Sequence, residues 1–262
     1  GFYRKVLFIN TEYYLRKLKK GIWIQKFRLQ NRNKKKFTCP ICRYSGPFED
    51  VNPSTGLRKH AKCPYCGSLE RHRLQYLVIQ VVLEGLNTTK MSMLHFAPEP
   101  LFRNFFSKRF GKYETADLEM EDVHYKVDLQ SLPFADATYD FVFASHVLEH
   151  IPNDIKAIEE IRRILKSNGI AILHVPLIAK KTIEYPEPNP HEACHVRAPG
   201  YDYFDRYVRY FFRIERYTSD SFPGEYQLFE YEDRSNWPTD KCPLLPAMDG
   251  ERHIDIVPVC YV

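Results

Sequence analysis

Four of the seven cysteines fall into two closely spaced pairs. The pairs are Cys39-x-x-Cys42 and Cys63-x-x-Cys66, and 20 residues separate them. This spacing is typical of a structural zinc ribbon, in which four thiolates surround a Zn²⁺ ion and leave no position open for chemistry. Disulfides are the alternative, but a reducing cytosol disfavours them and the short spacing within each pair favours a metal. We expect His60, which lies between the pairs, on the surface and not on the metal.

A second group of reactive side chains follows short segments in the middle of the chain that are expected to be strands. Asp117 and Asp128 each come after one such segment, and Ser145-His146 comes directly after another. Carboxylate and hydroxyl groups can hold a polar ligand, and an imidazole can take up a proton near neutral pH. These groups can form one site only if the segments that precede them end close together in space.

The segment around Ser145 has the pattern of a strand, a helix and a strand. Residues 141–144 read Phe-Val-Phe-Ala, which is too short for a helix and rich in residues that favour strands. Pro152 suits the first turn of a helix, and apolar residues recur every three or four positions over 154–166. Residues 169–175 read as the next buried strand after Asn168-Gly169. This arrangement predicts a parallel sheet and an α/β fold.

Two further strands are expected upstream. Residues 91–96 are followed by an amphipathic helix to Phe110, and residues 112–118 end near a carboxylate; a short strand at 123–127 precedes Asp128. In open α/β sheets, ligands bind at the carboxyl ends of strands near the reversal of strand order. Residues 95–100 and 145–150, with Asp117 and Asp128, are therefore the candidate ligand site.

Residues 128–151, which begin Asp-Leu-Gln-Ser-Leu-Pro-Phe and end Ser-His-Val-Leu-Glu-His-Ile, resemble the fourth-strand region of class I S-adenosylmethionine-dependent methyltransferases. Residues 162–169, Arg-Arg-Ile-Leu-Lys-Ser-Asn-Gly, resemble the helix end before their fifth strand. The resemblance is to the type 11-like members and covers about residues 90–215. It implies a Rossmann-like, doubly wound and mostly parallel sheet, here preceded by a small zinc ribbon. It also implies S-adenosyl-L-methionine as the methyl donor.

The same resemblance assigns cofactor contacts. It implies that Asp117 accepts hydrogen bonds from the ribose hydroxyls and that Asp128 lies near the adenine amine, although either carboxylate could instead belong to an ordinary loop or cap. The full set of expected cofactor contacts is Phe96, Ala97, Glu99, Asp117, Leu118, Asp128, Leu129 and Ser145.

The turn after the first strand departs from the family pattern. The family usually has an acidic residue and a Gly-x-Gly-x-Gly turn there, whereas this chain reads His-Phe-Ala-Pro-Glu-Pro-Leu over residues 95–101. Glycine lets the backbone approach a cofactor closely. Either Ala97 and Pro98 build another turn, or the cofactor is no longer bound. Glu99 either faces the cofactor's ammonium group or begins the next helix, where negative charge is favoured.

Histidines are the candidate catalytic residues, because methylation of a hydroxyl or amine also requires removal of a proton. His146 follows the strand expected beside the reacting methyl group and is the preferred general base. His150 follows closely and is interpreted as architectural. His191 and His195, further along the chain, are the competing candidates.

His191 and His195 lie in a proline-rich segment. Four prolines within 184–200 forbid a helix and predict a stiff loop, part of a lid over 178–200. A metal-binding interpretation of His191, Glu192 and His195 stays open. The His-Val-Arg sequence at 195–197, with the residues after it, is similar to bacterial methyltransferases associated with polysaccharide modification.

Positive charge is concentrated at the start of the chain. Residues 1–38 hold 12 Lys or Arg and one acidic residue, Glu12, a net charge of +11; residues 39–262 hold 26 basic and 32 acidic residues, a net charge of −6. A basic arm with interleaved aromatic residues favours contact with RNA or an anionic membrane surface. The alternatives are a solvated, partly disordered extension and a helix docked on a partner.

The chain is therefore divided into a basic arm (1–38), a zinc ribbon (39–67) and a Rossmann-like domain (68–262) with an insertion at about 220–250. Ser68 is expected to cap a helix over 69–84, and residues 253–262 to form a final strand. No apolar run approaches 18 residues, so no transmembrane helix is expected. The cytoplasm is the expected location, with the arm offering contact with the inner membrane surface.

Three functions are consistent with this sequence. The favoured one is S-adenosylmethionine-dependent O-methylation of a sugar, a polysaccharide-related glycan or another small acceptor. The second is methylation of RNA, because of the basic arm and a resemblance to a ribosomal RNA guanine methyltransferase type with a zinc module before its Rossmann domain. The third is a catalytically silent binding module that has lost the glycine turn.

Overall fold

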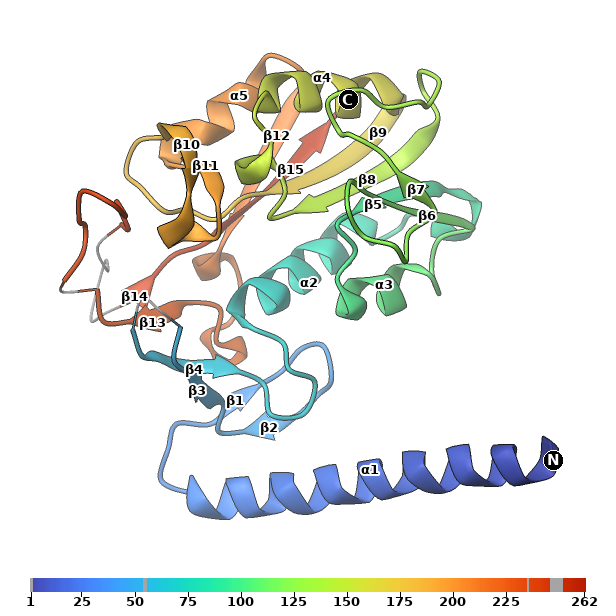
Figure 1. The fold of residues 1–262 in the computed structure, drawn as a ribbon, viewed down its shortest axis with the longest axis vertical. Helices are drawn as coiled ribbons and strands as arrows, with labels where there is room; N and C mark the ends of the chain where they lie inside the picture. Colours follow the sequence, from blue (N-terminus) through green and yellow to red (C-terminus); the bar gives the residue numbers. More distant parts are fainter. Residues whose placement is uncertain (1, 54–55, 235, 246–251) are drawn as a thin grey trace.

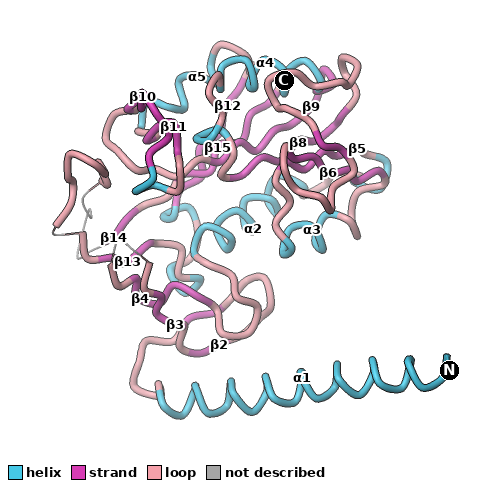
Figure 2. The backbone as a smooth tube through the Cα atoms, in the orientation of Figure 1, coloured by secondary structure: helices cyan, strands magenta, loops and turns pink. Residues whose placement is uncertain are grey.

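A seven-stranded sheet lies at the centre of the structure, a computed structural model that describes residues 2–53, 56–234, 236–245 and 252–262 (Figures 1 and 2). Its strands lie in the order β12-β15-β9-β8-β5-β6-β7. They are β5 (Ser92–Phe96), β6 (Lys112–Asp117), β7 (Tyr125–Lys126), β8 (Tyr139–Ser145), β9 (Leu165–His174), β12 (Arg213–Thr218) and β15 (Ile256–Tyr261). The strands expected in the middle of the chain are all among them.

The first five strands of this sheet are parallel. β5 pairs with β6 and β8, β6 with β7, and β8 with β9. From β7 to β9 their chain order is 3-2-1-4-5, as in Rossmann-type folds, and the order reverses beside β5. β15 is antiparallel to both β9 and β12. The predicted Rossmann-like, mostly parallel sheet is confirmed.

Helices cover both faces of the sheet (Figure 1). α2 and α3 pack on one face in a core that includes Phe106 and Phe143, and α4 and α5 pack on the other with Ile158 and Tyr207. The α-helices are α1 (Phe2–Gln30), α2 (Glu70–Leu83), α3 (Pro100–Phe106), α4 (Asp154–Ile164) and α5 (Asp205–Val208). The 3-10 turns are η1 (Thr88–Lys90), η2 (Leu148–His150), η3 (Pro190–Glu192), η4 (Tyr201–Phe204), η5 (Ser219–Ser221) and η6 (Gly224–Tyr226).

Two helix ends differ from expectation. α3 stops at Phe106, short of Phe110. Ser68 does not cap α2: the N-cap residue is Leu69, whose backbone N–H donates to His72 Nδ1 at 3.0 Å. The Ser68 hydroxyl lies instead against the sulfurs of Cys39 and Cys66. Its role is in the cysteine cluster, which a helix-capping pattern does not reveal.

The ribbon and the C-terminal insertion share a sheet. β1 (Phe37–Thr38) pairs with β2 (Ser45–Gly46), and a second sheet has the order β14-β13-β4-β3. Its strands are β3 (Glu49–Val51), β4 (Arg58–Lys62), β13 (Glu230–Glu232) and β14 (Arg252–His253). Tyr231 pairs with Lys59 across β13 and β4. The insertion thus completes the ribbon, although its residues 235 and 246–250 lie outside the described residues.

One buried arginine side chain connects α2 with the ribbon and the insertion. Arg73 on α2 is fully buried and donates hydrogen bonds to the carbonyl oxygens of Ala61, Ser68, Tyr226 and Gln227. A guanidinium satisfied by backbone carbonyls ties α2, the ribbon and the insertion together. The first turn of α2 is accordingly not a freely solvated basic patch.

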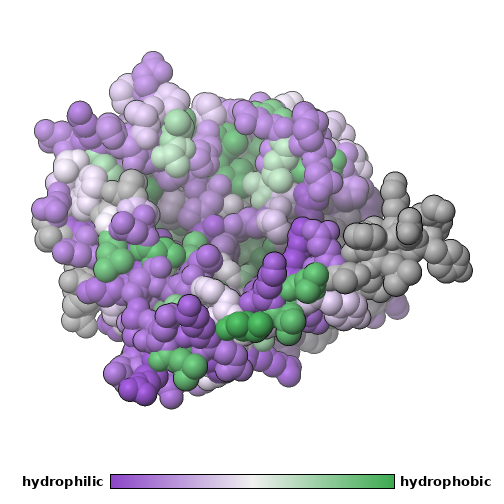
Figure 3. All heavy atoms as spheres, turned by 60° about the horizontal axis from the view of Figure 1, so that its bottom comes forward, coloured by the Kyte–Doolittle hydropathy of each residue, from purple (hydrophilic) through white to green (hydrophobic). Residues whose placement is uncertain are grey.

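The basic arm forms the long helix α1, which extends beside the ribbon (Figure 1). Ile24 is buried in the ribbon core with Phe37, and the Arg28 guanidinium lies over the Tyr44 ring. Residues 12–23 are exposed, including Leu15, Leu18 and Ile22. The surface on this side is mostly hydrophilic with apolar patches (Figure 3). No helix in the described part of the chain is long and apolar enough to cross a membrane.

The proline-rich segment is a hairpin and not the expected irregular loop. β10 (Ile183–Asn189) pairs antiparallel with β11 (His195–Ala198), with a register shift between Glu184 and Asn189. The prolines at 186 and 188 fall within that shift, where no ladder hydrogen bond requires their missing N–H. Proline content correctly excluded a helix, but it did not exclude an edge strand.

Candidate active site

A cavity of about 450 Å³ opens at the carboxyl ends of β5, β6 and β8. This is the place where strand order reverses and where ligands are expected. Six of the eight predicted cofactor contacts line it: Phe96, Ala97, Asp117, Leu118, Asp128 and Leu129. The residues that complete the wall are Ala116, Glu119, Val127, His146, Val147, His150, Ile151 and Cys194.

The two aspartates of this cavity have fixed orientations. Asp117 Oδ1 accepts hydrogen bonds from the backbone N–H groups of Glu119 and Met120, both at 2.8 Å. Asp128 Oδ1 accepts from the backbone N–H of Gln130 at 2.9 Å. Each carboxylate is anchored by its own loop, so it is held ready at the cavity wall.

The turn after β5 is built without glycine. Ala97 adopts φ +44°, in the left-handed region, and its N–H donates to the carbonyl oxygen of Ala116 on β6 at 3.0 Å. Pro100 then begins α3. Alanine tolerates this conformation at some cost because its side chain is a single methyl group. The chain thus builds another turn after β5 without glycine.

His95, at the position where the family usually has an acidic residue, faces the core. Its Nδ1 lies 2.9 Å from the Tyr113 hydroxyl, and its ring packs against Phe106 and Phe143. Burial lowers the pKa of His95 to about 3, which keeps the ring neutral. It therefore belongs to the helix–sheet interface and not to the cavity.

Two predicted cofactor contacts lie elsewhere. Glu99 caps α3 and forms ion pairs with Arg71 at 2.7 Å and His72 at 3.0 Å. Burial opposes ionisation of Glu99, but the hydrogen bonds from His72 and Arg71 outweigh it and hold its pKa well below the usual value. Ser145 is buried and accepts a hydrogen bond from Gln75 at 2.7 Å. Neither residue lines the cavity.

A second cavity, of about 370 Å³, lies between the hairpin and the sheet shared by ribbon and insertion. It is lined by Arg58, Arg71, His146, Pro176, Leu177, Ile178, His191, Glu192, Ala193, His195, Glu230, Glu232, Arg234, Cys242, Leu244, His253, Ile254 and Asp255. Among the described residues, His146 lines both this cavity and the first one. The preferred general base of the sequence thus lies in the walls of both cavities.

His146 has an unusual backbone and an unsatisfied ring. Its φ is +55°, and its Nε2 is buried without a hydrogen-bond partner among the described residues. Nδ1 lies 3.4 Å from Glu149 Oε1. Burial lowers the pKa of His146 well below the usual value, and nearby Arg71 and His174 act in the same direction. The ring is therefore neutral, and its Nε2 makes no hydrogen bond to any described residue.

Behind His146 lies a buried polar chain that sequence reasoning missed. The His146 ring packs on the His174 ring, with the two ring centroids 5.0 Å apart. His174 Nδ1 lies 2.6 Å from Gln75 Nε2, and its Nε2 lies 2.9 Å from Asp255 Oδ1. Asp255 directly precedes β15, and His174 is the last residue of β9. The antiparallel pairing of these two strands brings the two side chains together.

A cluster of three potential ligand groups lies beside His146. Glu149 and His150 come from η2 and His195 from β11, and one ligand atom of each lies within 4.8 Å of the others. Burial raises the pKa of Glu149 and lowers that of His195 to about 4. His191, on η3, is exposed and does not join this cluster.

Arg197 explains why residues so distant in sequence meet. Its guanidinium donates to the carbonyl oxygens of Leu148, Ile151 and Pro152 and pairs with Glu184 at 3.0 Å. Because Arg197 is two residues from His195, this contact fixes β11 against η2 and holds His195 beside His150. The sequence shows the arginine, but it does not indicate which groups the arginine contacts, because these are backbone oxygens.

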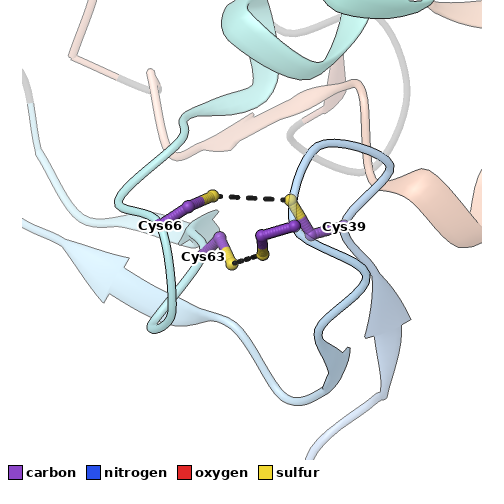
Figure 4. A group of neighbouring side chains, drawn as sticks. Cys39, Cys63 and Cys66 are labelled. Atoms are coloured by element: carbon purple, nitrogen blue, oxygen red, sulfur yellow. Dashed lines mark hydrogen bonds between the residues drawn. The ribbon is translucent and has the colours of Figure 1, made fainter. Parts of the chain in front are cut away.

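The four cysteines of the ribbon converge as predicted (Figure 4). Cys39 Sγ lies 3.6 Å from Cys66 Sγ, and Cys42 Sγ lies 3.6 Å from Cys63 Sγ. The sulfurs are not joined as disulfides. His60 lies apart from them, with its Nδ1 3.9 Å from Asp50 Oδ1.

Comparison with known proteins places the sheet in a family. Residues 104–173 match the family model described as "Methyltransferase domain". The match identifies this segment of the chain as part of a methyltransferase domain. The methyltransferase resemblance and the Rossmann-like fold expected from the sequence are thereby confirmed.

Similar proteins share only part of this methyltransferase chain. Over 62 residues it is 42% identical to a sterol 4-C-methyltransferase of Caenorhabditis elegans. The matched region covers 24% of this chain and 18% of that protein. Over 63 residues it is 36% identical to a demethylmenaquinone methyltransferase of Staphylococcus epidermidis. The matched region covers 24% of this chain and 25% of that protein. The chain thus matches a quarter or less of these relatives' length.

One solved structure has the same fold over most of the chain. It is an S-adenosylmethionine-dependent methyltransferase of Mesorhizobium loti, with a TM-score of 0.50 and 10% identity. The likeness covers 72% of this chain and 98% of that one. At this identity the comparison supports the methyltransferase fold alone.

Proposed function

We propose that this methyltransferase transfers the methyl group of S-adenosylmethionine to an oxygen of a small polar acceptor, such as a sugar or glycan hydroxyl. One observation carries the proposal: the cavity with the expected cofactor residues and a second cavity share His146 in their walls. A methyl donor in the first cavity and an acceptor in the second would face each other at His146. Proximity of two bound reactants is a large part of catalysis in such transfers.

The first cavity has groups suited to the cofactor. Asp117, at the end of β6, would accept hydrogen bonds from the ribose, and Asp128, which lines the same cavity, would lie near the adenine. Phe96, Leu118 and Leu129 offer apolar surface for the adenine ring. The glycine-free turn at Ala97 leaves the cavity open, so the silent-module alternative loses its main support.

The second cavity favours a neutral, hydroxyl-rich acceptor. Its arginines are already paired: Arg58 with Glu70 and Glu230, and Arg234 with Glu230 and Glu232. Balanced charges provide many hydrogen-bonding groups without a strong net field. An apolar acceptor would leave Glu192 Oε2, His195 Nδ1 and His253 Nε2, which have no partner among the described residues, unsatisfied, and that is costly.

His146 is the proposed general base. It lines both cavities, and its partnerless Nε2 has no competing hydrogen bond in the described part of the chain. The acceptor oxygen would attack the methyl carbon as the carbon–sulfur bond breaks, while the acceptor's proton passes to the imidazole. His191 and His195, the competing bases, line only the acceptor cavity.

We further propose that the cysteine cluster holds a structural Zn²⁺ ion. Sulfurs at the corners of a tetrahedron around zinc, each about 2.3 Å from the metal, lie about 3.8 Å apart. The measured pair distances of 3.6 Å fit that arrangement. With four thiolate ligands such a site would have no open position and would act by holding the ribbon together.

The basic helix α1 is proposed to contact an anionic surface, either RNA or membrane. Its exposed half, residues 12–23, presents Arg16, Lys17, Lys19 and Lys20 beside apolar side chains. This combination suits phosphate groups next to a less polar surface. RNA as the methyl acceptor remains the second candidate function on this ground.

The direct test of the function is product detection. We expect the protein to convert S-adenosylmethionine labelled in its methyl group into S-adenosylhomocysteine when supplied with fractions of cell extract, with the label recovered in a small polar product. Label recovered in RNA would favour the second candidate. Absence of turnover with every fraction, despite cofactor binding, would contradict the proposed function.

A further inference from the structure

The cluster of Glu149, His150 and His195 contains a buried carboxylate with nothing to balance it. Glu149 has no exposed side-chain surface, and neither of its carboxylate oxygens has a hydrogen-bond partner among the described residues. The ionisable His146 ring, which is neutral, lies 3.4 Å from Glu149 Oε1. A buried, unpaired carboxylate is expensive, and native proteins rarely keep one without a function.

One histidine of the cluster, His195, is unsatisfied in the same way. His195 Nδ1 is buried without a partner in the described part of the chain, and it lies 3.9 Å from Glu192 Oε2, which is also partnerless. The rings of His150 and His195 meet edge to face, with centroids 4.7 Å apart. Arg197, although adjacent, gives its hydrogen bonds to backbone carbonyls and to Glu184. No described cationic side chain neutralises Glu149.

We propose that Glu149, His150 and His195 bind a divalent transition-metal ion, such as Zn²⁺, Mn²⁺ or Fe²⁺, distinct from the cysteine cluster. Two imidazoles and one carboxylate are a common ligand set for these ions and leave coordination positions open. Ligand atoms on one ion lie at most about 4.2 Å apart, twice a bond of about 2.1 Å. The three groups, within 4.8 Å of one another, need only small side-chain rotations to meet this condition.

The position of the cluster indicates what the ion would do. His150 lines the first cavity and His195 lines the second, so the cluster spans the boundary between them. An ion there would have its open positions at the junction where donor and acceptor are proposed to meet. Ala193 and Cys194, with φ of +51° and +61°, precede His195 and show that the hairpin end is held in a strained conformation.

The role in catalysis rests on the proposed function, whereas the metal site does not. An acceptor hydroxyl bound to the ion would lose its proton more readily, because the cation stabilises the oxyanion. The oxygen then forms a bond to the methyl carbon, the carbon–sulfur bond breaks, and the sulfonium becomes a neutral thioether. The acceptor's proton goes to His146.

Metal content per chain tests the site. After equilibrium dialysis against Zn²⁺, we expect the parent protein to hold about two zinc ions, one on the cysteines and one on this cluster. Glu149→Gln and His150→Ala are each expected to hold about one. His150 is exposed, so its replacement is the variant least able to disturb folding. Thermal unfolding of each variant checks that it is folded.

A matched control and a second probe sharpen the result. His191→Ala removes another histidine of the same cavity and should keep both ions. In Co²⁺-loaded protein, Glu149→Gln should lose the weak visible bands of a nitrogen–oxygen site and keep the intense thiolate charge-transfer bands. Affinity for the second ion should fall by about 100-fold or more, since even outer-shell groups contribute about 10- to 100-fold.

Two ions in both folded variants would overturn the inference, as would one ion in the parent protein. S-Adenosylmethionine affinity, measured by calorimetry on the same samples, separates this failure from that of the proposed function. Cofactor binding with no second ion refutes the metal site alone. A second ion with no cofactor binding refutes the proposed function and leaves the metal site standing.

Discussion

At the scale of single residues, two backbone irregularities of this chain lie at the ends of β5 and β8. Ala97 and His146 both have positive φ, and each follows one of these strands. A non-glycine residue in this conformation costs about 1–2 kcal/mol, and such strain persists where the surrounding structure enforces it, commonly at functional sites. Both residues line the cofactor cavity.

His146→Ala is expected to lower turnover by about 100- to 10,000-fold, the range for loss of a general base. Affinity for S-adenosylmethionine should change little, because the lost interaction belongs to the transition state. Steady-state kinetics and calorimetry measure the two effects separately. Full turnover in His146→Ala combined with loss in His191→Ala would move the base to the hairpin.

At the scale of elements, local pattern predicted the strands and helices well, and long-range pairing escaped it. The apolar run at 141–144 and the periodic helix at 154–166 are present as β8 and α4. The hairpin of β10 and β11 was missed because its prolines occupy a register shift. The contact between η2 and β11 depends on Arg197 and backbone carbonyls, which leave no sequence signal.

The exposed half of α1 leads to a test of the arm. Replacing Lys17, Lys19 and Lys20 with Glu should weaken binding to RNA or to vesicles of anionic lipid, whichever the parent binds, and flatten its salt dependence. Cofactor affinity should not change, since these residues lie outside both cavities. Binding that is equal in parent and variant at low salt would show that the arm has another role.

At the scale of the whole molecule, the ribbon is part of the wall of the second cavity, which is proposed to bind the acceptor. The sheet β14-β13-β4-β3 contributes Arg58, Glu230, Glu232 and His253 to the acceptor cavity. The cysteine spacing predicted the ribbon itself, and the sheet confirms that the Rossmann-like domain follows it. Its completion by the C-terminal insertion was not predictable, because strands of two or three residues carry no periodicity.

Cys39→Ser should remove the zinc ion proposed for the ribbon and lower the thermal stability of the protein. We expect the loss to weaken the acceptor cavity more than cofactor binding, since Cys39 lies in the ribbon core. Elemental analysis, thermal unfolding and calorimetry give the three readouts. Cys194→Ser, which changes an exposed cysteine outside the cluster, is the control for zinc and stability. Unchanged zinc in Cys39→Ser would refute the assignment of the ligands.

The central claim is that the cavity at β5, β6 and β8 binds S-adenosylmethionine despite its glycine-free turn. Calorimetric titration of the cofactor into the parent protein and into Asp117→Ala tests it most directly. We predict binding by the parent and a loss of about 1–3 kcal/mol in the variant, the scale of a charge-assisted hydrogen bond. Equal affinity in both proteins would place the ribose elsewhere, and no binding by the parent would contradict the claim.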